Sequence, residues 1–158
     1  MAANDLDTLR RELVPAAGAA SLSHGVFALV LQPGELLTTV QRLRDEFVFD
    51  VLLDVTAVDW PAAALRFEVV HHLYSTTHKV RVRLKTRVAA AEPVVASLCA
   101  LYGSAAYMER ECHDMYGIVF RGNHDLRPIL LYEGFVGHPL RKDYPKRAEQ
   151  PLVPYRDA

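Results

Sequence analysis

The sequence predicts an α+β domain followed by a long extended C-terminal segment. First, 158 residues, of which 51% are hydrophobic, are enough for one domain with one core. Second, apolar patterns of helical and strand period follow one another over residues 1–116, which we assign to the core domain. Third, residues 117–158 are rich in glycine and proline, which excludes long helices there. We therefore expect helices packed on a mostly antiparallel four-stranded sheet, with an appended segment.

The first third of the domain reads as helix, strand and helix. Residues 6–14 carry leucines at helical spacing and end before Pro15. Residues 24–31 are an apolar run that ends before Pro33, which is typical of a strand. Residues 35–47 repeat apolar side chains every three or four positions, which predicts an amphipathic helix lying on the sheet.

Three further strands are predicted over residues 51–60, 65–75 and 79–88. The connections at residues 61–64 and 76–78 are short, which favours antiparallel neighbours. In the last strand five basic residues alternate with apolar or threonine side chains, so one face is buried and the other solvated.

Two helices are predicted after the strands. Pro93 suits a first helical turn and Gly103 a helix end, so we expect a helix over residues 93–102. A second helix is expected to begin near Ala105.

The second helix carries a group of charged residues. Arg110 and Asp114 are four positions apart and are expected to pair, as are Glu109 and His113. Glu111 is expected close to the apolar side, where a charge needs a partner, so an arginine from the following segment should reach it.

An active site in this helix is an alternative. Its carboxylates and His113, with Cys112, could act as acid/base groups or metal ligands. However, His71 and His72 are adjacent on a strand and face opposite sides, so they cannot both join one ion from the same side. No His-Glu-x-x-His, Gly-x-Ser-x-Gly or phosphate-loop pattern is present, and paired charges on a helix more often organise structure.

Composition bears on location and partners. The net charge of −1 gives no general reason to expect nucleic acid, although the basic strand face of residues 79–88 leaves that alternative open. No apolar run reaches the length of a membrane span or resembles a secretory signal. Cys99 and Cys112 are too few for an iron–sulfur cluster and are expected to be free thiols.

The segment from residue 117 keeps many apolar residues despite its glycines and prolines. A disordered tail would be poorer in them. An ordered, irregular segment with this much apolar surface is expected to lie along another protein.

A long motif in this region resembles one family. It comprises Glu109-Arg110-Glu111, Asp114-Met115-Tyr116-Gly117-Ile118, Phe120, Gly122, Asp125-Leu126-Arg127, Ile129-Leu130 and Gly137-His138-Pro139-Leu140-Arg141-Lys142-Asp143-Tyr144-Pro145. The motif is similar to that of the C subunit, the 30 kDa-type peripheral-arm subunit of the proton-pumping NADH:quinone oxidoreductase, respiratory complex I. Four positions depart from the family pattern and bear on the contacts made there: Tyr107, His113, Asn123 and His124.

The resemblance implies a non-catalytic structural subunit that carries no cofactor and no metal. FMN, iron–sulfur clusters, NADH and quinone would belong to partner subunits, and the D and I subunits of the complex would be its neighbours. It would be peripheral, on the cytoplasmic side of the bacterial inner membrane, and bound there only through other subunits. An equivalent subunit of a membrane-bound hydrogenase or another complex I-like enzyme is the alternative.

The charged residues of the motif are expected to form ion pairs that fix the segment on its own domain or on the D subunit. These residues are Glu109, Arg110, Glu111, Asp114, Arg127, Arg141, Lys142 and Asp143.

Overall fold

The computed structural model describes residues 19–23, 26–147 and 150. The helix expected over residues 6–14 lies outside the described residues. The elements in chain order are β1 (Ala19–Ser23), β2 (Val26–Leu31), the 3-10 turn η2 (Pro33–Glu35), α2 (Leu36–Asp45), β3 (Val51–Asp59), β4 (Phe67–Ser75), β5 (Val80–Val88), β6 (Val94–Ala96), α3 (Ala105–Tyr116) and β7 (Val119–Arg121). The fold class α+β is confirmed, and so are the strands predicted near β3, β4 and β5.

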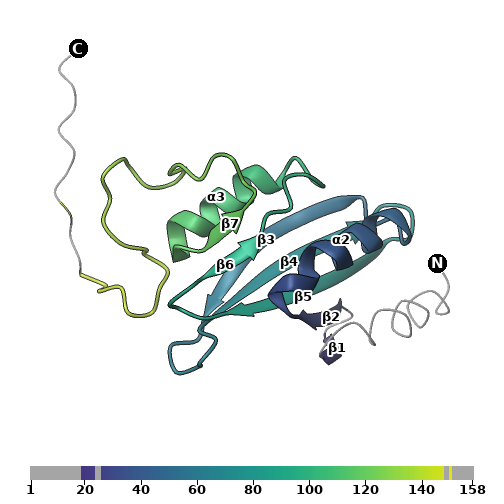
Figure 1. The fold of residues 1–158 in the computed structure, drawn as a ribbon, viewed down its shortest axis with the longest axis horizontal. Coiled ribbons are helices and arrows are strands. Elements are labelled where there is room, and N and C mark those ends of the chain that lie inside the picture. Colours follow the sequence, from purple (N-terminus) through teal and green to yellow (C-terminus); the bar gives the residue numbers. More distant parts are fainter. Residues whose placement is uncertain (1–18, 24–25, 148–149, 151–158) are drawn as a thin grey trace, which may run out of the picture.

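The main sheet differs from the prediction of a four-stranded, mostly antiparallel sheet. It has five strands in the order β1-β2-β5-β4-β3, and β2 pairs with β5 in parallel. The parallel pair arises because α2 carries the chain from β2 across to β3 at the far edge (Figure 1), and two antiparallel pairings then bring β5 back beside β2. The fifth strand, β1, adds an antiparallel edge and was not predicted from its Ala- and Ser-rich sequence.

The predicted helix over residues 93–102 is wrong. β6 pairs in parallel with β7, and the backbone N–H of Ser97 continues this pairing to the carbonyl of Arg121 at 2.9 Å. Val94 and Val95 are β-branched and favour a strand once a partner strand is available. The predicted helix near Ala105 is confirmed as α3, which ends at Gly117 in the left-handed conformation.

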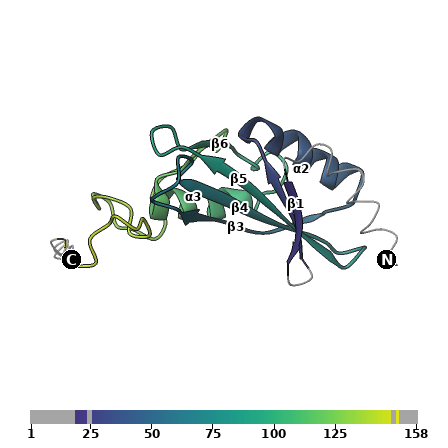
Figure 2. The ribbon, with the colours of Figure 1, turned by 90° about the horizontal axis from the view of Figure 1, so that it is seen from below.

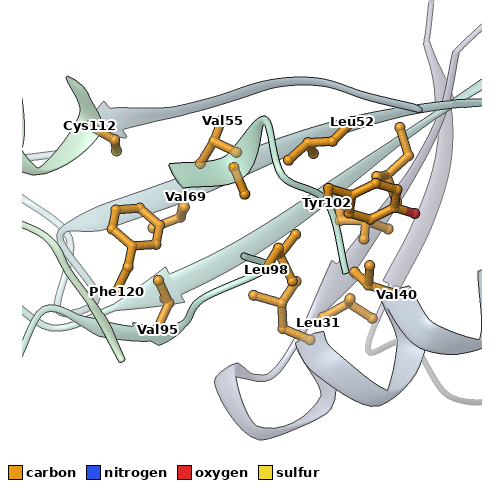
Figure 3. Packing of buried hydrophobic residues seen from close by; sticks show 14 of the residues in the cluster. Leu31, Val40, Leu52, Val55, Val69, Val95, Leu98, Tyr102, Cys112 and Phe120 are labelled. Atoms are coloured by element: carbon orange, nitrogen blue, oxygen red, sulfur yellow. The ribbon is translucent and has the colours of Figure 1, made fainter. Parts of the chain in front are cut away.

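The helices and the small β6–β7 sheet cover one face of the main sheet. Apolar side chains of α2 and the strands join Leu98, Tyr102 and Phe120 in a single buried cluster (Figure 3). The buried Tyr102 hydroxyl donates a 2.6 Å hydrogen bond to the carbonyl of Phe49, which ties the loop before α3 to the start of β3. The cluster thus holds α3 at a fixed position beside β3.

Residues 122–147 contain no helix or strand. In Figure 1 this yellow-green segment loops around the end of α3. Figure 2, turned by 90°, shows it beyond the end of the sheet, on the side of α3 and away from β1. The segment therefore lies against the side of α3 that does not face the core.

Candidate subunit interface

The carboxylate that α3 buries is that of Glu109, whereas the sequence predicts that Glu111 lies near the apolar side. Ala105, Glu109 and Cys112 lie on its buried side, as their spacing of three to four residues requires. Glu109 is fully buried, whereas Glu111 is exposed and has no ion pair among the described residues. The expectation that Glu111 lies near the apolar side and is reached by an arginine is therefore wrong, because the apolar face of α3 is centred on Glu109.

Glu109 is held by neutral donors. Its carboxylate accepts hydrogen bonds from the Ser97 hydroxyl at 2.7 Å, the Leu98 backbone N–H at 2.7 Å and the Asn123 side-chain amide at 3.0 Å. The expected pair with His113 is not formed, since His113 Nδ1 lies 2.9 Å from the carbonyl oxygen of Ile118. Glu109 thus joins α3 to the loop after β6 and to the start of the C-terminal segment.

Asp114 organises the middle of the segment. Its Oδ2 accepts hydrogen bonds from the backbone N–H groups of Ile129, Leu130 and Leu131, at 2.7, 2.9 and 3.3 Å. Burial alone would raise the pKa of Asp114, but these three N–H groups hold it below its usual range. One carboxylate on α3 therefore fixes three successive backbone positions.

The four-residue spacing predicts a pair between Arg110 and Asp114, but this pair is not formed. Its guanidinium donates to the carbonyls of Arg127 and Pro128, both at 2.9 Å, and lies 3.8 Å from Asp125. Arg127 pairs with Asp125 at 2.8 Å on the surface. Arg110 thus joins α3 to residues 125–128 of the segment.

A second attachment lies at the end of the main sheet. Asp59, whose side chain is inaccessible, pairs with both Arg66 Nε and Nη2 at 2.7 and 2.8 Å, and Arg66 Nη1 reaches Asp143 at 2.8 Å. The backbone N–H of Lys142 donates to Asp59 at 2.7 Å. Hydrogen bonding from Arg66 holds the pKa of Asp59 below its usual range. Asp143 and Lys142 thus join the sheet across about 80 residues of chain.

Arg141 lies between the two attachments. Its Nε donates to the carbonyl of Tyr116 at 2.6 Å, and its guanidinium lies over the ring of Phe67, 5.0 Å from the ring centroid. Burial and the nearby Arg66 lower the pKa of Arg141. The guanidinium thus stacks on the core side of β4 and does not form an ion pair among the described residues.

Gly117 is required where α3 meets this group. It has a φ of 71°, and a Cβ there would overlap His138 Nε2 and Arg141 Nη2. His138 Nδ1 in turn lies 2.9 Å from the carbonyl oxygen of Asp114. The close approach of the segment to the C-terminus of α3 therefore depends on a residue without a side chain.

Several large hydrophobic side chains of the segment are exposed. Leu130 is 61% exposed and Val136 is 75% exposed, which places two large aliphatic side chains in solvent within one short stretch. Other large hydrophobic side chains exposed along the segment are Ile129, Tyr132 and Leu140. Exposed hydrophobic side chains in a segment that is attached to its own domain are typical of a protein–protein interface.

Sequence reasoning missed several residues of these attachments. Asp59, Arg66 and Ser97 were not singled out, because no local spacing marks them, and Asn123 was named only as a departure from the family pattern. Within the described residues, no group of three or more His, Cys, Asp or Glu could hold a metal ion. No helix there is both long and apolar enough to span a bilayer.

Together these features define a class of α+β domain whose irregular C-terminal segment is fixed by charged side chains and exposes several large hydrophobic residues. The chain belongs to the family described as the respiratory-chain NADH dehydrogenase 30 Kd subunit, which matches residues 29–150. The family expected from the sequence motif is thereby confirmed.

Relatives and solved structures agree with this assignment. The C subunit of NADH-quinone oxidoreductase from Methylorubrum populi is 42% identical over 135 residues, covering 84% of this chain and 61% of the relative. The Rhodopseudomonas palustris strain TIE-1 protein of the same name is 40% identical over 148 residues, covering 90% and 72%. The chain thus spans about three fifths of the length of several such relatives.

Among solved structures, the trypsin-resistant fragment of Nqo5 is 25% identical, with a TM-score of 0.71, covering 77% of this chain and 99% of the fragment. A chain of an archaeal membrane-bound sulfane sulfur reductase has a TM-score of 0.78 at 23% identity, covering 92% of this chain and 86% of that chain. The second likeness shows the shared fold.

Proposed function

We propose that this chain is a structural subunit of the peripheral arm of an NADH:quinone oxidoreductase and supports electron transfer from NADH to quinone coupled to proton translocation. The observation that carries the proposal is the 42% identity to the C subunit of that enzyme. We further propose that the chain has no catalytic residue and no cofactor. FMN, iron–sulfur clusters, NADH and quinone then belong to other subunits.

The proposed mechanism is positional. Asp114 and the Asp59–Arg66–Asp143 group hold the C-terminal segment from behind, so its apolar side chains are ordered before a partner binds. Preordering reduces the entropy lost on association. We propose that the D subunit receives this surface and that the I subunit lies nearby, which places the chain on the cytoplasmic side of the bacterial membrane through its partners.

The proposal is tested by replacing the outer apolar residues without disturbing the attachments. The double variant Leu130→Asp/Val136→Asp is expected to fold normally, because both side chains are largely exposed, but to disappear from the purified membrane complex. Leu53→Asp is a matched control, since Leu53 is also exposed but lies on β3. Retention of the double variant at the control level would reject this interface.

Affinity purification of the full chain separates the proposal from its alternative. An NADH:quinone oxidoreductase is expected to yield flavin- and cluster-containing subunits that oxidise NADH. A complex that takes up or releases hydrogen and lacks NADH oxidation would instead assign the chain to a membrane-bound hydrogenase.

A further inference from the structure

A second exposed surface lies at the end of the main sheet. Trp60 is 46% exposed, and the guanidinium of Arg87 lies over its ring at 5.8 Å from the centroid. Leu65, in the turn between β3 and β4, is 45% exposed. Tryptophan and arginine are the residues most enriched among those that contribute most to binding in protein interfaces.

Two hollows adjoin at this place. The larger, of about 570 Å³, lies between η2, the end of β5 and β6, and its apolar lining includes Leu37, Leu65 and Val95. The smaller, of about 340 Å³, lies against Trp60 and the turn that follows it. Arg87 lines both hollows, so the two are neighbours on this surface.

The charges around the larger hollow favour binding of an anionic group. Arg87 and Arg121 line it together with a single acidic residue, Glu92. Arg87 Nε forms an ion pair with the buried Glu68 at 2.9 Å. The side chain of Arg121 is exposed and makes no hydrogen bond or ion pair within the described part of the chain. A carboxylate placed here would gain a partner without displacing one.

The same charges disfavour a second copy of this chain. A two-fold interface brings the same patch to itself, so Arg121, which has no side-chain partner in the described part of the chain, would lie on both sides of the contact. A carboxylate from a different protein has no such penalty. This surface is therefore suited to a partner that differs from this chain.

We propose that the surface formed by Trp60, Leu65, Arg87 and Arg121 is a second docking site, for a segment of another subunit that carries a bulky apolar side chain beside an Asp or Glu. The apolar side chain fills the larger hollow against Leu65, and the carboxylate binds Arg121. This inference rests on the proposed function, since it requires a multisubunit assembly. It adds a contact on the sheet end, apart from the exposed residues 129–140.

The experiment uses the photoreactive residue p-benzoylphenylalanine in the complete complex. One variant carries it in place of Leu65, and another in place of Leu130 in the C-terminal segment. On irradiation, the Leu65 variant is expected to cross-link to a peptide of another subunit in which an Asp or Glu lies within a few residues of a bulky apolar residue. Mass spectrometry of the cross-linked peptide checks this.

Two failures are distinguishable. A cross-link from position 130 but none from position 65 would overturn the second docking site and leave the proposed function intact. A chain that never enters the complex would overturn both. A cross-link from position 65 to a second copy of this chain, or to a peptide without a carboxylate, would also overturn the inference.

Charge reversal gives an independent measurement. Arg121→Glu places a negative charge opposite the expected carboxylate and should lower the apparent affinity of the chain for the rest of the complex about tenfold at low salt. Arg81→Glu is the matched control, because Arg81 is an exposed arginine at the other end of β5. Equal retention of the two variants in the purified complex would overturn the docking site.

Discussion

The main sheet and residues 122–147 are stabilised in different ways. The sheet is joined by continuous backbone hydrogen bonds and covered by one buried apolar cluster. Residues 122–147 have no helix or strand and are attached through a few charged side chains, among them the buried carboxylates of Asp59, Glu109 and Asp114. The stability of the segment therefore depends on a few charged residues, whereas that of the sheet depends mainly on its core.

The two regions also differ in which residues occupy positions with a left-handed backbone conformation. Among the residues that the structure describes, the glycines with positive φ are Gly117, Gly122, Gly134 and Gly137, all in or next to the segment. In the described part of the sheet domain, positive φ falls instead on Val48 and Lys79. The loops of the domain thus carry backbone strain at residues with a Cβ, whereas the segment places glycine at such positions.

The largest expected effect comes from Asp59→Ala. Arg66, whose side chain is 16% exposed, would lose its bidentate partner, and the Lys142 N–H would lose its acceptor. We expect the free energy of unfolding to fall by about 3–4 kcal/mol, as for breaking one partner of a buried pair. Urea unfolding followed by circular dichroism measures this loss.

Asp143→Ala is the control in the same group. Asp143 also binds Arg66, but its side chain is 59% exposed, so its removal should cost much less. Equal losses for the two variants would show that the attachment does not depend on the buried carboxylate.

The next expected effect concerns pH and the core. His71 is fully buried with neither ring nitrogen bonded among the described residues, and burial, aided by the nearby His72, lowers its pKa to about 4. The unfolded chain therefore binds a proton on His71 from about pH 6.5 downwards, while the folded chain does not. This difference leaves the free energy of unfolding unaffected above about pH 6.5. It should lower the free energy of unfolding by about 3 kcal/mol as the pH drops to 4.

His71→Leu should remove most of this pH dependence, and His72→Leu should not, because His72 is half-buried on the opposite face. Unfolding measured at pH 7, 5.5 and 4.5 checks this. The attachments of the segment are lost only at lower pH. The lowered pKa values of Asp59 and Asp114 keep both carboxylates charged until the pH falls below about 4. A wild-type stability that is flat between pH 6.5 and 4 would contradict the role of His71.

Much of the sheet domain follows from sequence because its signals are local. The alternation over residues 79–88 and the helical spacing after Ala105 lead directly to β5 and α3. β6 was mistaken for a helix because a short apolar run does not distinguish the two, and its partner β7 lies more than 20 residues later. β1 has small residues and no strong strand pattern of its own.

The attachments of the segment were less accessible to sequence reasoning. The buried face of α3 is centred on Glu109 and not near Glu111, which the spacing of apolar residues does not reveal. Asp59 and Arg66 meet Lys142 and Asp143 across about 80 residues, so nothing in the local pattern reveals them. Long-range ion pairs require the fold before they can be assigned.

A smaller effect is expected from Gly117→Ala. The left-handed φ of 71° disfavours any residue with a Cβ, and this Cβ would also displace His138 and Arg141. We expect a loss of about 2 kcal/mol and faster proteolysis within residues 122–147. Gly103→Ala is the control, because a Cβ there meets nothing within 4 Å and the loop keeps its conformation. Similar proteolysis of both variants would reject the close approach at Gly117.

The smallest expected effect is a gain, and it lies in the sheet domain. Val48 has a φ of 56°, which a β-branched residue adopts at a cost, and its side chain is 40% exposed, so it buries little. Asparagine tolerates this conformation, so Val48→Asn should raise the free energy of unfolding by about 0.5–1 kcal/mol. Val136→Asn, at an exposed valine without positive φ, should bring no gain. Urea unfolding of both variants measures the difference, and an unchanged or lower stability of Val48→Asn would mean that packing in the turn after α2 outweighs the backbone strain.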